Sequence, residues 1–399
     1  MHVTARLLAA LEAATEDRFV FDLPGIEERY AALLRELPGV SVRFAIKACP
    51  VAEVLSCLAR KGSGFDAASP NEVAQAIAAG APLDRIHYGN TVKSDRNIAE
   101  AYRLGVRDFA TDSVEDVRAI AAHAPGARVF CRLATDGRGA MWSLSDKFGC
   151  SAADVPIVME AALTAGLTPA GLSLHVGSQQ MTAEAWISAL AGLADVLAAL
   201  NRRGIPLTRV NLGGGLPALG YLDHGGGPLN PPLDKMFAVI REGMQRLREI
   251  SHHALDFVME PGRHLVADHG ALRAHVCRLS TRRRADGERQ YWLYLSCGKF
   301  NGLYEMDAVQ YPMIFPTHPG RDHVQAIVAG PTCDNHDTFN EGRVTVPVPR
   351  AVASGDPVWL LSCGAYATSY TTQGFNGFSP LPYVCVDRER DLPPEGEGR

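Results

Sequence analysis

Short apolar, β-rich runs alternate with helix-length, Ala- and Leu-rich segments between residues 40 and 265. In segments such as 69–80 and 183–203, apolar positions recur with the period of an amphipathic helix. Eight runs have the length and composition of buried strands: 42–47, 64–69, 86–90, 108–111, 127–133, 171–175, 209–213 and 256–260. This alternation predicts parallel strands joined by helices.

The strand candidates end in a regular way, which bears on how they are arranged. Most of them end in, or lie just before, a polar residue or glycine: Lys47, Asp66, Asn90, Arg132, His175, Gly213 and Glu260. Barrel active sites are assembled from the C-terminal ends of strands. We therefore predict an α/β fold with a TIM-type (β/α)8 barrel, and an open doubly wound sheet is the competing arrangement.

The helical period fades after Arg263, and a second type of pattern begins. Alternating or clustered apolar runs, separated in several places by Gly- and Pro-rich turns, occur at 276–280, 290–295, 324–328, 344–348 and 358–361. We expect residues 25–265 to form the barrel and residues 1–24 and 266–385 to form a mainly-β domain, a β-sandwich or a barrel-like unit. The charged stretch 386–399, with Pro and Gly, is predicted to be a disordered tail.

The composition narrows the function classes. Apolar residues make up 47% and charged residues 21% of the 399 residues, which is typical of a soluble globular protein. The net charge of -5 predicts no nucleic-acid partner, and the absence of an apolar run of about 18 residues predicts no membrane span. The N-terminal apolar stretch is too short for a signal peptide. Nine scattered cysteines without a C-x-x-C pair predict neither disulfides nor zinc, and favour a cytoplasmic protein.

Lys47 is the first candidate for chemistry because it closes an apolar strand candidate. The ordinary structural interpretation is a lysine whose stem packs while its ammonium reaches solvent. An amine held in an apolar barrel mouth would instead have a lowered pKa and could form a Schiff base with a carbonyl.

Three consecutive glycines, Gly213, Gly214 and Gly215, follow the seventh strand candidate. They allow backbone N–H groups to approach an anion, and the corresponding loops of barrels commonly bind phosphate. Ser178 and Arg263 would add a hydroxyl and a cation to the same anion, although a flexible glycine loop explains the pattern equally well.

Three further side chains have both a structural and a chemical interpretation. His175 at a strand end is either a buried, hydrogen-bonded histidine or a catalyst. Glu260 either pairs with Arg263 or, beside a pyridine nitrogen, keeps that nitrogen protonated. Cys333 is either a small buried apolar residue or a reactive thiol beside Asp334.

Nine short segments, taken in their order along the chain, carry a resemblance to a known family. They are Phe44-Ala45-Ile46-Lys47-Ala48, Phe65-Asp66-Ala67-Ala68-Ser69, Lys147-Phe148-Gly149, His175-Val176-Gly177-Ser178, Gly213-Gly214-Gly215, Glu260-Pro261-Gly262-Arg263, Gly330-Pro331-Thr332-Cys333-Asp334, Gly364-Ala365-Tyr366 and Phe375-Asn376-Gly377-Phe378. Over residues 20–385 the chain resembles the ornithine/lysine/diaminopimelate/arginine decarboxylase family of fold-type III pyridoxal-phosphate enzymes. Cys333-Asp334 and the last segment are similar to the ornithine/lysine branch.

The resemblance implies pyridoxal 5'-phosphate as cofactor and gives each candidate a role. Lys47 would hold the cofactor covalently, His175 would stack on its ring, and Glu260 would bind the ring nitrogen. Its phosphate would be held by Gly213, Gly214, Gly215, Ser178, Arg263 and Tyr366. Asp66 and Arg132 would line the cofactor side near Lys47.

The resemblance also implies a homodimer with shared active sites. Cys333 would then act in the neighbouring barrel and protonate the substrate carbon after carbon dioxide leaves. Asp334 would bind the distal ammonium of a diamino acid, and we expect Cys297 and Phe375 beside the substrate as well. The predicted reaction is decarboxylation of ornithine or lysine, within polyamine biosynthesis.

One departure from the branch leaves the substrate open. Bacterial members of the branch often have an aspartate where Ser296 stands, and losing a charge-assisted bond lowers the affinity for a diamine by about 1.5–3 kcal/mol. The alternatives are therefore a decarboxylase of a modified or non-standard amino acid in a specialised pathway, an amino-acid racemase, or a catalytically silent homologue. The last is disfavoured because the candidate cofactor ligands and Cys333 are all present.

Overall fold

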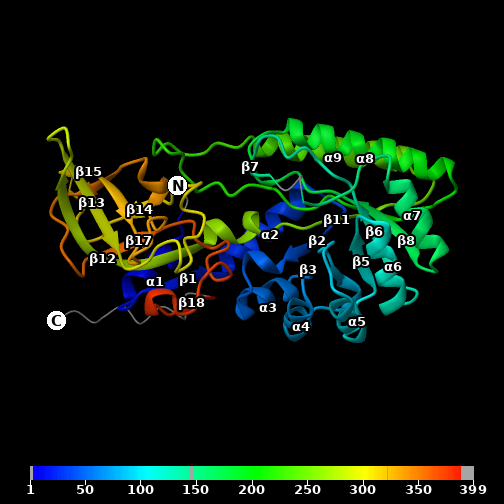
Figure 1. Cartoon of the computed structure of the whole chain (residues 1–399), viewed down its shortest axis with the longest axis horizontal. Helices are drawn as coiled ribbons and strands as arrows, with labels where there is room; N and C mark the ends of the chain where they lie inside the picture. Colours follow the sequence, from blue (N-terminus) through cyan, green and yellow to red (C-terminus); the bar gives the residue numbers. More distant parts are fainter. Residues whose placement is uncertain (1–2, 144–146, 321, 388–399) are drawn as a thin grey trace. The chain divides into compact units, whose positions relative to one another are not determined.

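The structure is a computed structural model of the chain, and it describes residues 3–143, 147–320 and 322–387 (Figure 1). From residue 388 onward, the predicted tail lies outside the described residues. The chain divides into two compact units. The barrel unit comprises Arg29–Pro217 and Pro231–His264, and the β-rich unit comprises Met1–Glu28, Ala218–Asn230 and Leu265–Arg399.

Eight parallel strands of the barrel unit close on themselves. In barrel order they are β2 (Val40–Ala45), β3 (Gly64–Ala67), β4 (Ile86–Tyr88), β5 (Asp108–Thr111), β6 (Arg128–Arg132), β8 (Thr168–Ser173), β10 (Arg209–Asn211) and β11 (Asp256–Met259). Each coincides with one of the predicted runs, so the prediction of a (β/α)8 barrel rather than an open sheet is confirmed. The one difference near Lys47 is that β2 ends at Ala45, and the lysine lies in a short 3-10 turn, η1 (Ile46–Ala48).

Helices follow most of these strands, and several begin at a serine. They are α2 (Leu23–Glu36), α3 (Ala52–Arg60), α4 (Pro70–Ala78), α5 (Asp95–Arg103), α6 (Val114–His123), α7 (Val155–Thr164), α8 (Glu184–Arg202), α9 (Leu233–Ile250) and α10 (Arg263–Val266). Ser69, Ser94 and Ser113 cap α4, α5 and α6, each hydroxyl accepting a bond from a backbone N–H of the first turn. Such caps satisfy donors that have no partner within the helix.

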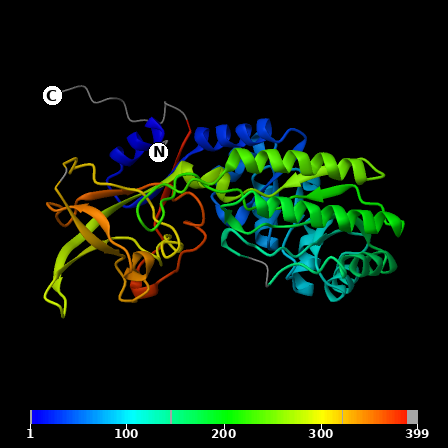
Figure 2. The same cartoon turned by 90° about the horizontal axis from the view of Figure 1, so that it is seen from above.

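Among the described residues, α8 is the one helix that by length and composition could cross a membrane. It runs alongside α9 in both views (Figure 2). Its apolar face, which includes Trp186, Leu193 and Leu197, is buried. This is the pattern of an outer barrel helix that packs on one side.

The β-rich unit contains a sheet in the order β14 (Met313–Ile314), β17 (Pro357–Leu360), β12 (Gly270–Arg283), β13 (Arg289–Leu295), β15 (His323–Ala329) and β16 (Val346–Pro349). Strand β1 (Arg18–Asp22) pairs with β12 and with β18 (Tyr383–Val386). Helix α1 (Ala5–Ala13) places Leu7 and Leu11 in one apolar cluster with Trp359 and Leu361. The mainly-β character predicted for this part of the chain is confirmed.

Segment Ala218–Asn230 belongs to the β-rich unit, whereas the sequence pattern assigned it to the barrel. Its backbone explains the difference, because the amides of Leu219 and Gly220 each donate to the Asp268 carboxylate at 2.9 Å. Leu222 also forms an antiparallel bridge with Gln310. These bonds join residues far apart in sequence, so local periodicity carries no sign of them.

Candidate active site

The C-terminal ends of the barrel strands bring the candidate side chains to one end of the barrel unit. Lys47 follows β2, Arg132 ends β6, His175 follows β8, and Glu260 follows β11. Because the strands are parallel and closed, their carboxyl ends all face the same way. Side chains that are up to 213 residues apart in sequence therefore share one site.

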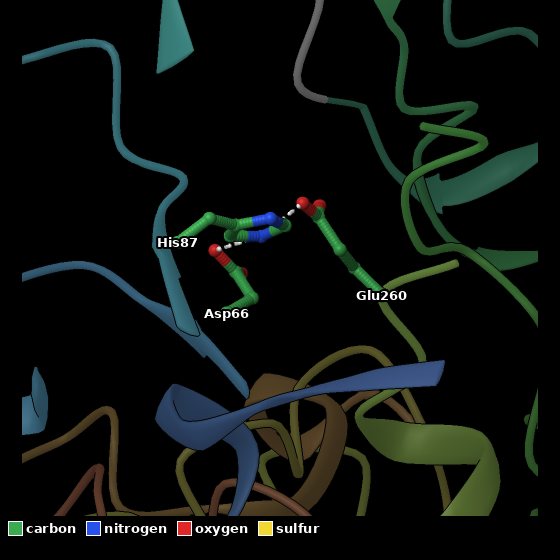
Figure 3. A group of neighbouring side chains, drawn as sticks. All are labelled: Asp66, His87 and Glu260. Atoms are coloured by element: carbon green, nitrogen blue, oxygen red, sulfur yellow. Dashed lines mark ion pairs between the residues drawn. The ribbon is translucent and has the colours of Figure 1, made fainter. Parts of the chain in front are cut away.

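A line of charged groups lies across this end of the barrel, and Figure 3 shows three of them, Asp66, His87 and Glu260. Lys47 Nζ lies 3.3 Å from Asp66 Oδ2, and Asp66 Oδ1 lies 3.3 Å from His87 Nε2. The same imidazole nitrogen lies 2.7 Å from Glu260 Oε1. The line thus joins the candidate cofactor lysine to the carboxylate expected at the ring nitrogen, and it passes through a histidine that the sequence analysis did not single out.

Asp66 is ionised in this setting. Burial alone would raise the pKa of its carboxyl, but the Lys47 ammonium and His87 outweigh burial and lower it well below its usual range. Lys47 itself is half-exposed, so its amine is accessible while it remains paired. An amine held beside a carboxylate at the open end of a barrel is suited to meet a carbonyl compound that enters there.

Asn211, the last residue of β10, orients Glu260. Its side-chain amide donates to Glu260 Oε1, and its carbonyl oxygen accepts from the Gly213 backbone N–H at 2.9 Å. The Glu260 backbone N–H donates in turn to the Gly213 carbonyl at 2.7 Å. The carboxylate and the glycine loop are therefore held together by one side chain that the sequence analysis missed.

The His175 imidazole is neutral. Its Nδ1 accepts a bond from the Gly177 backbone N–H at 3.0 Å, which an imidazolium could not do. Burial, together with the nearby cations Arg132 and Lys47, holds the pKa of His175 well below its usual value. A neutral aromatic ring in this place can stack on a flat heterocycle.

The glycine loop after β10 passes too close to its neighbours for any side chain. A Cβ on Gly213 would overlap the Leu174 carbonyl oxygen, and one on Gly214 would lie 2.8 Å from the Glu260 carbonyl oxygen. Gly213 and Gly215 also have positive φ, +64° and +113°, which favours glycine. The Gly215 carbonyl accepts from Gln180 N at 3.0 Å, so the loop lies against β9 (Ser178–Gln180).

Ser178 and Arg263 meet beside this loop. The Arg263 guanidinium donates to Ser178 Oγ at 3.2 Å from one terminal nitrogen and lies 4.5 Å from the Trp142 ring centroid. Trp142 belongs to β7 (Ala140–Trp142), which pairs with β9. The hydroxyl, the buried guanidinium and the glycine backbone together form a cradle whose chemistry fits a phosphate.

Arg132 completes the barrel side of the site. Its guanidinium carbon lies 4.8 Å from the Phe148 ring centroid. Burial lowers the pKa of Arg132, and the carboxylates Glu260 and Asp66 oppose that shift. The arginine therefore balances part of the negative charge of the two carboxylates.

The remaining predicted residues lie in the β-rich unit. The Cys333 thiol is exposed, and its backbone N–H donates to the Asn376 side chain at 2.9 Å, which joins two of the segments that carry the resemblance. Asp334 accepts from His336 N, and Phe375 packs against Phe300 with 4.6 Å between ring centroids. Tyr366 is half-buried and has a positive φ of 61°.

Cys297 departs from the expectation that it lies beside the substrate. Its side chain is fully buried within the β-rich unit, and burial raises the pKa of its thiol well above the ordinary value. A side chain with no accessible surface cannot touch a substrate, so the structure does not support that role.

One group of side chains in the described ranges has the composition of a metal site, namely Asp66, His87 and Glu260. Their nearest ligand atoms all lie within 4.8 Å of one another. The Lys47 ammonium, 3.3 Å from Asp66, already places a cation against this group. A second, divalent cation would be repelled there, so the chemistry of the donor set favours an organic cofactor held on the amine.

The barrel, the amine beside it and the phosphate cradle define the class, a pyridoxal-phosphate enzyme built on a TIM-type barrel. A family model, the pyridoxal binding domain of pyridoxal-dependent decarboxylases, matches residues 23–267. The chain therefore belongs to the pyridoxal-dependent decarboxylase family and is a decarboxylase that uses pyridoxal phosphate.

Individual relatives match the chain over most of their length. The lysine/ornithine decarboxylase of Selenomonas ruminantium is 31% identical over 372 residues, 92% of this chain and 89% of the relative. The solved lysine/ornithine decarboxylase of Vibrio vulnificus complexed with putrescine superposes with a TM-score of 0.82 at 26% identity, covering 96% of this chain and 99% of that one. Antizyme inhibitor 2 of Xenopus laevis is 29% identical over 392 residues, 93% of this chain and 82% of the relative.

Proposed function

We propose that the protein decarboxylates a basic L-amino acid to its amine and carbon dioxide. Ornithine and lysine are the first candidate substrates. The observation that carries the proposal is the line from Lys47 through Asp66 and His87 to Glu260, which pairs an accessible amine with a carboxylate for a ring nitrogen. The Selenomonas relative, a lysine/ornithine decarboxylase by name, supports the choice of substrates.

Each side chain of the barrel end has a part in holding the cofactor. Lys47 attaches it, His175 stacks on its ring, and Glu260 binds its ring nitrogen through the oxygen that Asn211 and His87 leave available. The loop Gly213–Gly215, Ser178 and Arg263 would hold the phosphate, and the resemblance adds Tyr366 to this set. Asp66 and Arg132 line the side near Lys47. When bound, pyridoxal phosphate withdraws electrons from the α-carbon of the amino acid and so favours loss of the carboxylate.

The charge states of these residues suit that role. An ionised carboxylate at the ring nitrogen keeps that nitrogen protonated, whereas a second cation on the ring face would oppose it. The neutral state of His175 avoids that second cation.

We also propose a homodimer in which Cys333 and Asp334 act in the partner's site. The support is a surface of the β-rich unit where Cys333 is exposed and large aromatic side chains are not covered. Tyr304, Tyr370, Phe375 and Phe378 are between 37% and 50% exposed there. Exposed aromatic residues are enriched in the core of protein interfaces. In this arrangement the Cys333 thiol donates the proton to the substrate carbon, and Asp334 binds the distal ammonium.

Ser296 stands where the resemblance leads us to expect an aspartate that faces the substrate. Ser296 accepts a hydrogen bond from the His275 backbone N–H at 2.9 Å, so its hydroxyl is engaged within the sheet. With Asp334 as the acid offered to a distal ammonium, a modified or non-standard basic amino acid is the second candidate substrate. Polyamine biosynthesis is the pathway that ornithine or lysine would imply. None of the cysteines in the described residues forms a disulfide, which supports a reducing compartment such as the cytoplasm.

A product assay tests the proposal. The purified holoenzyme is incubated with ornithine, lysine, arginine, diaminopimelate and shorter diamino acids, and the amines and carbon dioxide are quantified. We expect putrescine or cadaverine from the L-isomers, with none formed by Lys47→Ala. Preference for diaminopimelate would contradict the role of Asp334.

Incubation in heavy water separates decarboxylation from racemisation. Recovered substrate that keeps its L-configuration, together with release of carbon dioxide, supports the decarboxylase. Loss of configuration without carbon dioxide would show a racemase. If neither occurs in protein that carries the cofactor, the chain would be a silent homologue and the proposal would be refuted.

A further inference from the structure

His87 occupies the centre of the candidate active site. It is the middle residue of β4 and is directly paired in register with Asp66 of β3. Its neighbours in the strand point to the opposite face, because side chains alternate along a strand. His87 therefore points into the barrel, where its side chain is 1% exposed (Figure 3).

A single nitrogen of His87 faces two carboxylates. Nε2 lies 2.7 Å from Glu260 Oε1 and 3.3 Å from Asp66 Oδ1. One N–H cannot be aligned with both oxygens, and among the described residues neither Nε2 nor Oδ1 has a hydrogen bond of good geometry. The contact is therefore mainly one of charge, with the imidazole placed in the gap between two acids.

Without a cation in that gap the two acids would repel each other. The three facing atoms lie within 4.8 Å of one another; Asp66 and His87 are buried, and the Glu260 side chain is 13% exposed. Two carboxylates at such a distance do not both stay ionised, because the pKa of one of them rises. Glu260 must stay ionised to keep a ring nitrogen protonated, and Asp66 must stay ionised to hold Lys47.

We propose that His87 is a positioning residue that holds a positive charge between Glu260 and Asp66, keeps both carboxylates ionised and fixes Glu260 toward the ring nitrogen of the cofactor. This inference rests on the proposed function. It gives His87 the task of linking Asp66, which holds Lys47, to Glu260, which faces the ring nitrogen.

The groups around His87 are consistent with a charged imidazole. Asp66 of β3 and Glu260 after β11 face it as acids, Arg43 of β2 acts on it as a cation, and Phe130 of β6 lies 5.1 Å away between ring centroids. Burial and Arg43 would lower the pKa of His87, but the carboxylates of Asp66 and Glu260 outweigh them, and the net shift is upward. Arg132 contributes positive charge near the same two acids.

The first test observes the charge directly and needs no activity. The chain is labelled with 15N at histidine, and the ring nitrogens are followed by NMR against pH in the apoprotein and in the holoenzyme. The signal of His87 is assigned by its loss in His87→Gln. We expect both ring nitrogens of His87 to stay protonated at a pH where the histidines of the same chain, unfolded in urea, have become neutral. A neutral His87 ring under those conditions would overturn the proposal.

The second test measures cofactor binding. His87→Gln keeps a polar side chain but removes the charge, and we expect the dissociation constant for pyridoxal phosphate to rise about 10-fold or more. The matched control is Tyr88→Phe, which alters the opposite face of the same strand and should leave the constant within about 2-fold. In holoenzyme the pH profile of the visible absorbance should shift in His87→Gln, and kcat should fall more than KM changes.

A double variant distinguishes a charge effect of His87 from a packing effect. If His87 serves to separate two acids, removing one acid removes most of the need for it. We therefore expect His87→Gln to change the dissociation constant by less than about 3-fold when introduced into Asp66→Asn. Equal effects in both backgrounds would show that His87 acts only as a packing residue.

Failure of this inference can be told from failure of the proposed function. Normal cofactor affinity and spectrum in His87→Gln, with cofactor attachment lost in Lys47→Ala, would refute the role of His87 alone. Stoichiometric zinc that survives dialysis against a chelator would also refute it, because an imidazolium cannot bind a metal.

Discussion

At the N-terminal end of the barrel strands three guanidinium groups share one carboxylate, whereas at the C-terminal end one histidine lies between two carboxylates. Asp108, the first residue of β5, accepts two bonds from Arg128, at 2.6 and 3.0 Å, and one from Arg209 at 2.9 Å. Arg43 approaches the same carboxylate at 3.7 Å. Both ends are charged and largely buried, but a carboxylate is the central group at the first end and an imidazole is the central group at the second.

The two ends also differ in what a change of pH can do. Burial would raise the pKa of Asp108, but the three arginines lower it, and burial lowers the pKa of Arg43 only to about 10. Those groups keep one charge state around neutrality. The C-terminal end holds an imidazole and an amine, groups whose protonation can change within a reaction. The comparison teaches that the first end serves folding and the second serves chemistry.

Replacing Lys47 has the largest expected effect. Lys47→Ala removes the amine that holds the cofactor, and we expect kcat/KM to fall by about 10^4-fold or more. The visible absorbance band of the bound cofactor should disappear as well. Lys61→Ala, which alters a lysine at the other end of the barrel unit, is the control and should retain both activity and band.

Replacing Asp108 should have the next largest effect, but on stability. Asp108→Asn leaves three guanidinium groups without their shared counter-charge, and removing one partner of a buried ion pair typically costs about 3–5 kcal/mol of unfolding free energy. Urea unfolding of the apoprotein measures this loss. Cofactor affinity in the folded variant should stay close to that of the wild type. A large loss of affinity would contradict the assignment of the N-terminal end to folding alone.

Replacing Glu260 should show the reverse pattern. Glu260→Gln keeps the size of the side chain but removes the charge opposite the ring nitrogen, so we expect kcat to fall by about 10²–10³-fold. Unfolding of the apoprotein should change less than in Asp108→Asn, because the variant also relieves repulsion with Asp66. Steady-state kinetics and urea unfolding on the same preparation test both halves of this expectation.

The pH dependence of stability is the smallest effect. The pKa of His87 is raised in the folded chain, so its contribution is fully present below the unfolded pKa and is lost as pH rises through the folded pKa. The difference in unfolding free energy between wild type and His87→Gln should therefore shrink as pH rises above about 6.5. Asp66 has the opposite sign, since its lowered pKa gives stability that is lost only in strong acid. A difference that grows with pH would contradict the assignment of charge.

The barrel was predictable because its signal is local. Each strand of the barrel is a short apolar run whose polar end residue marks the carboxyl end, so both the eight strands and residues such as Lys47 and Glu260 could be read from the pattern. Short strands such as β14 (Met313–Ile314) were missed because two residues are too few to show an alternating apolar pattern. Such a strand is defined only by its pairing with a neighbouring strand.

His87 and Asn211 were missed for a different reason. Each lies within an apolar run in which alternation alone indicates that one side chain faces the barrel interior, but the sequence does not say what that side chain meets. The register of β3 with β4 places His87 beside Asp66, and closure of the barrel brings Glu260 to the same point. Alternation in 86–88 was the signal that could have found His87. Cys297 was expected at the substrate through the resemblance alone, and its burial depends on long-range packing that the sequence does not show.

Reduction of the purified holoenzyme with borohydride, followed by peptide mass mapping, tests the central claim most directly. Borohydride makes the link between cofactor and lysine permanent, so the attachment residue can be read from the mass of one peptide. We predict a phosphopyridoxyl group on the peptide that contains Lys47, and none on that peptide from Lys47→Ala. Attachment to another lysine, such as Lys93, or the absence of any attached cofactor in fully reconstituted protein, would contradict the account.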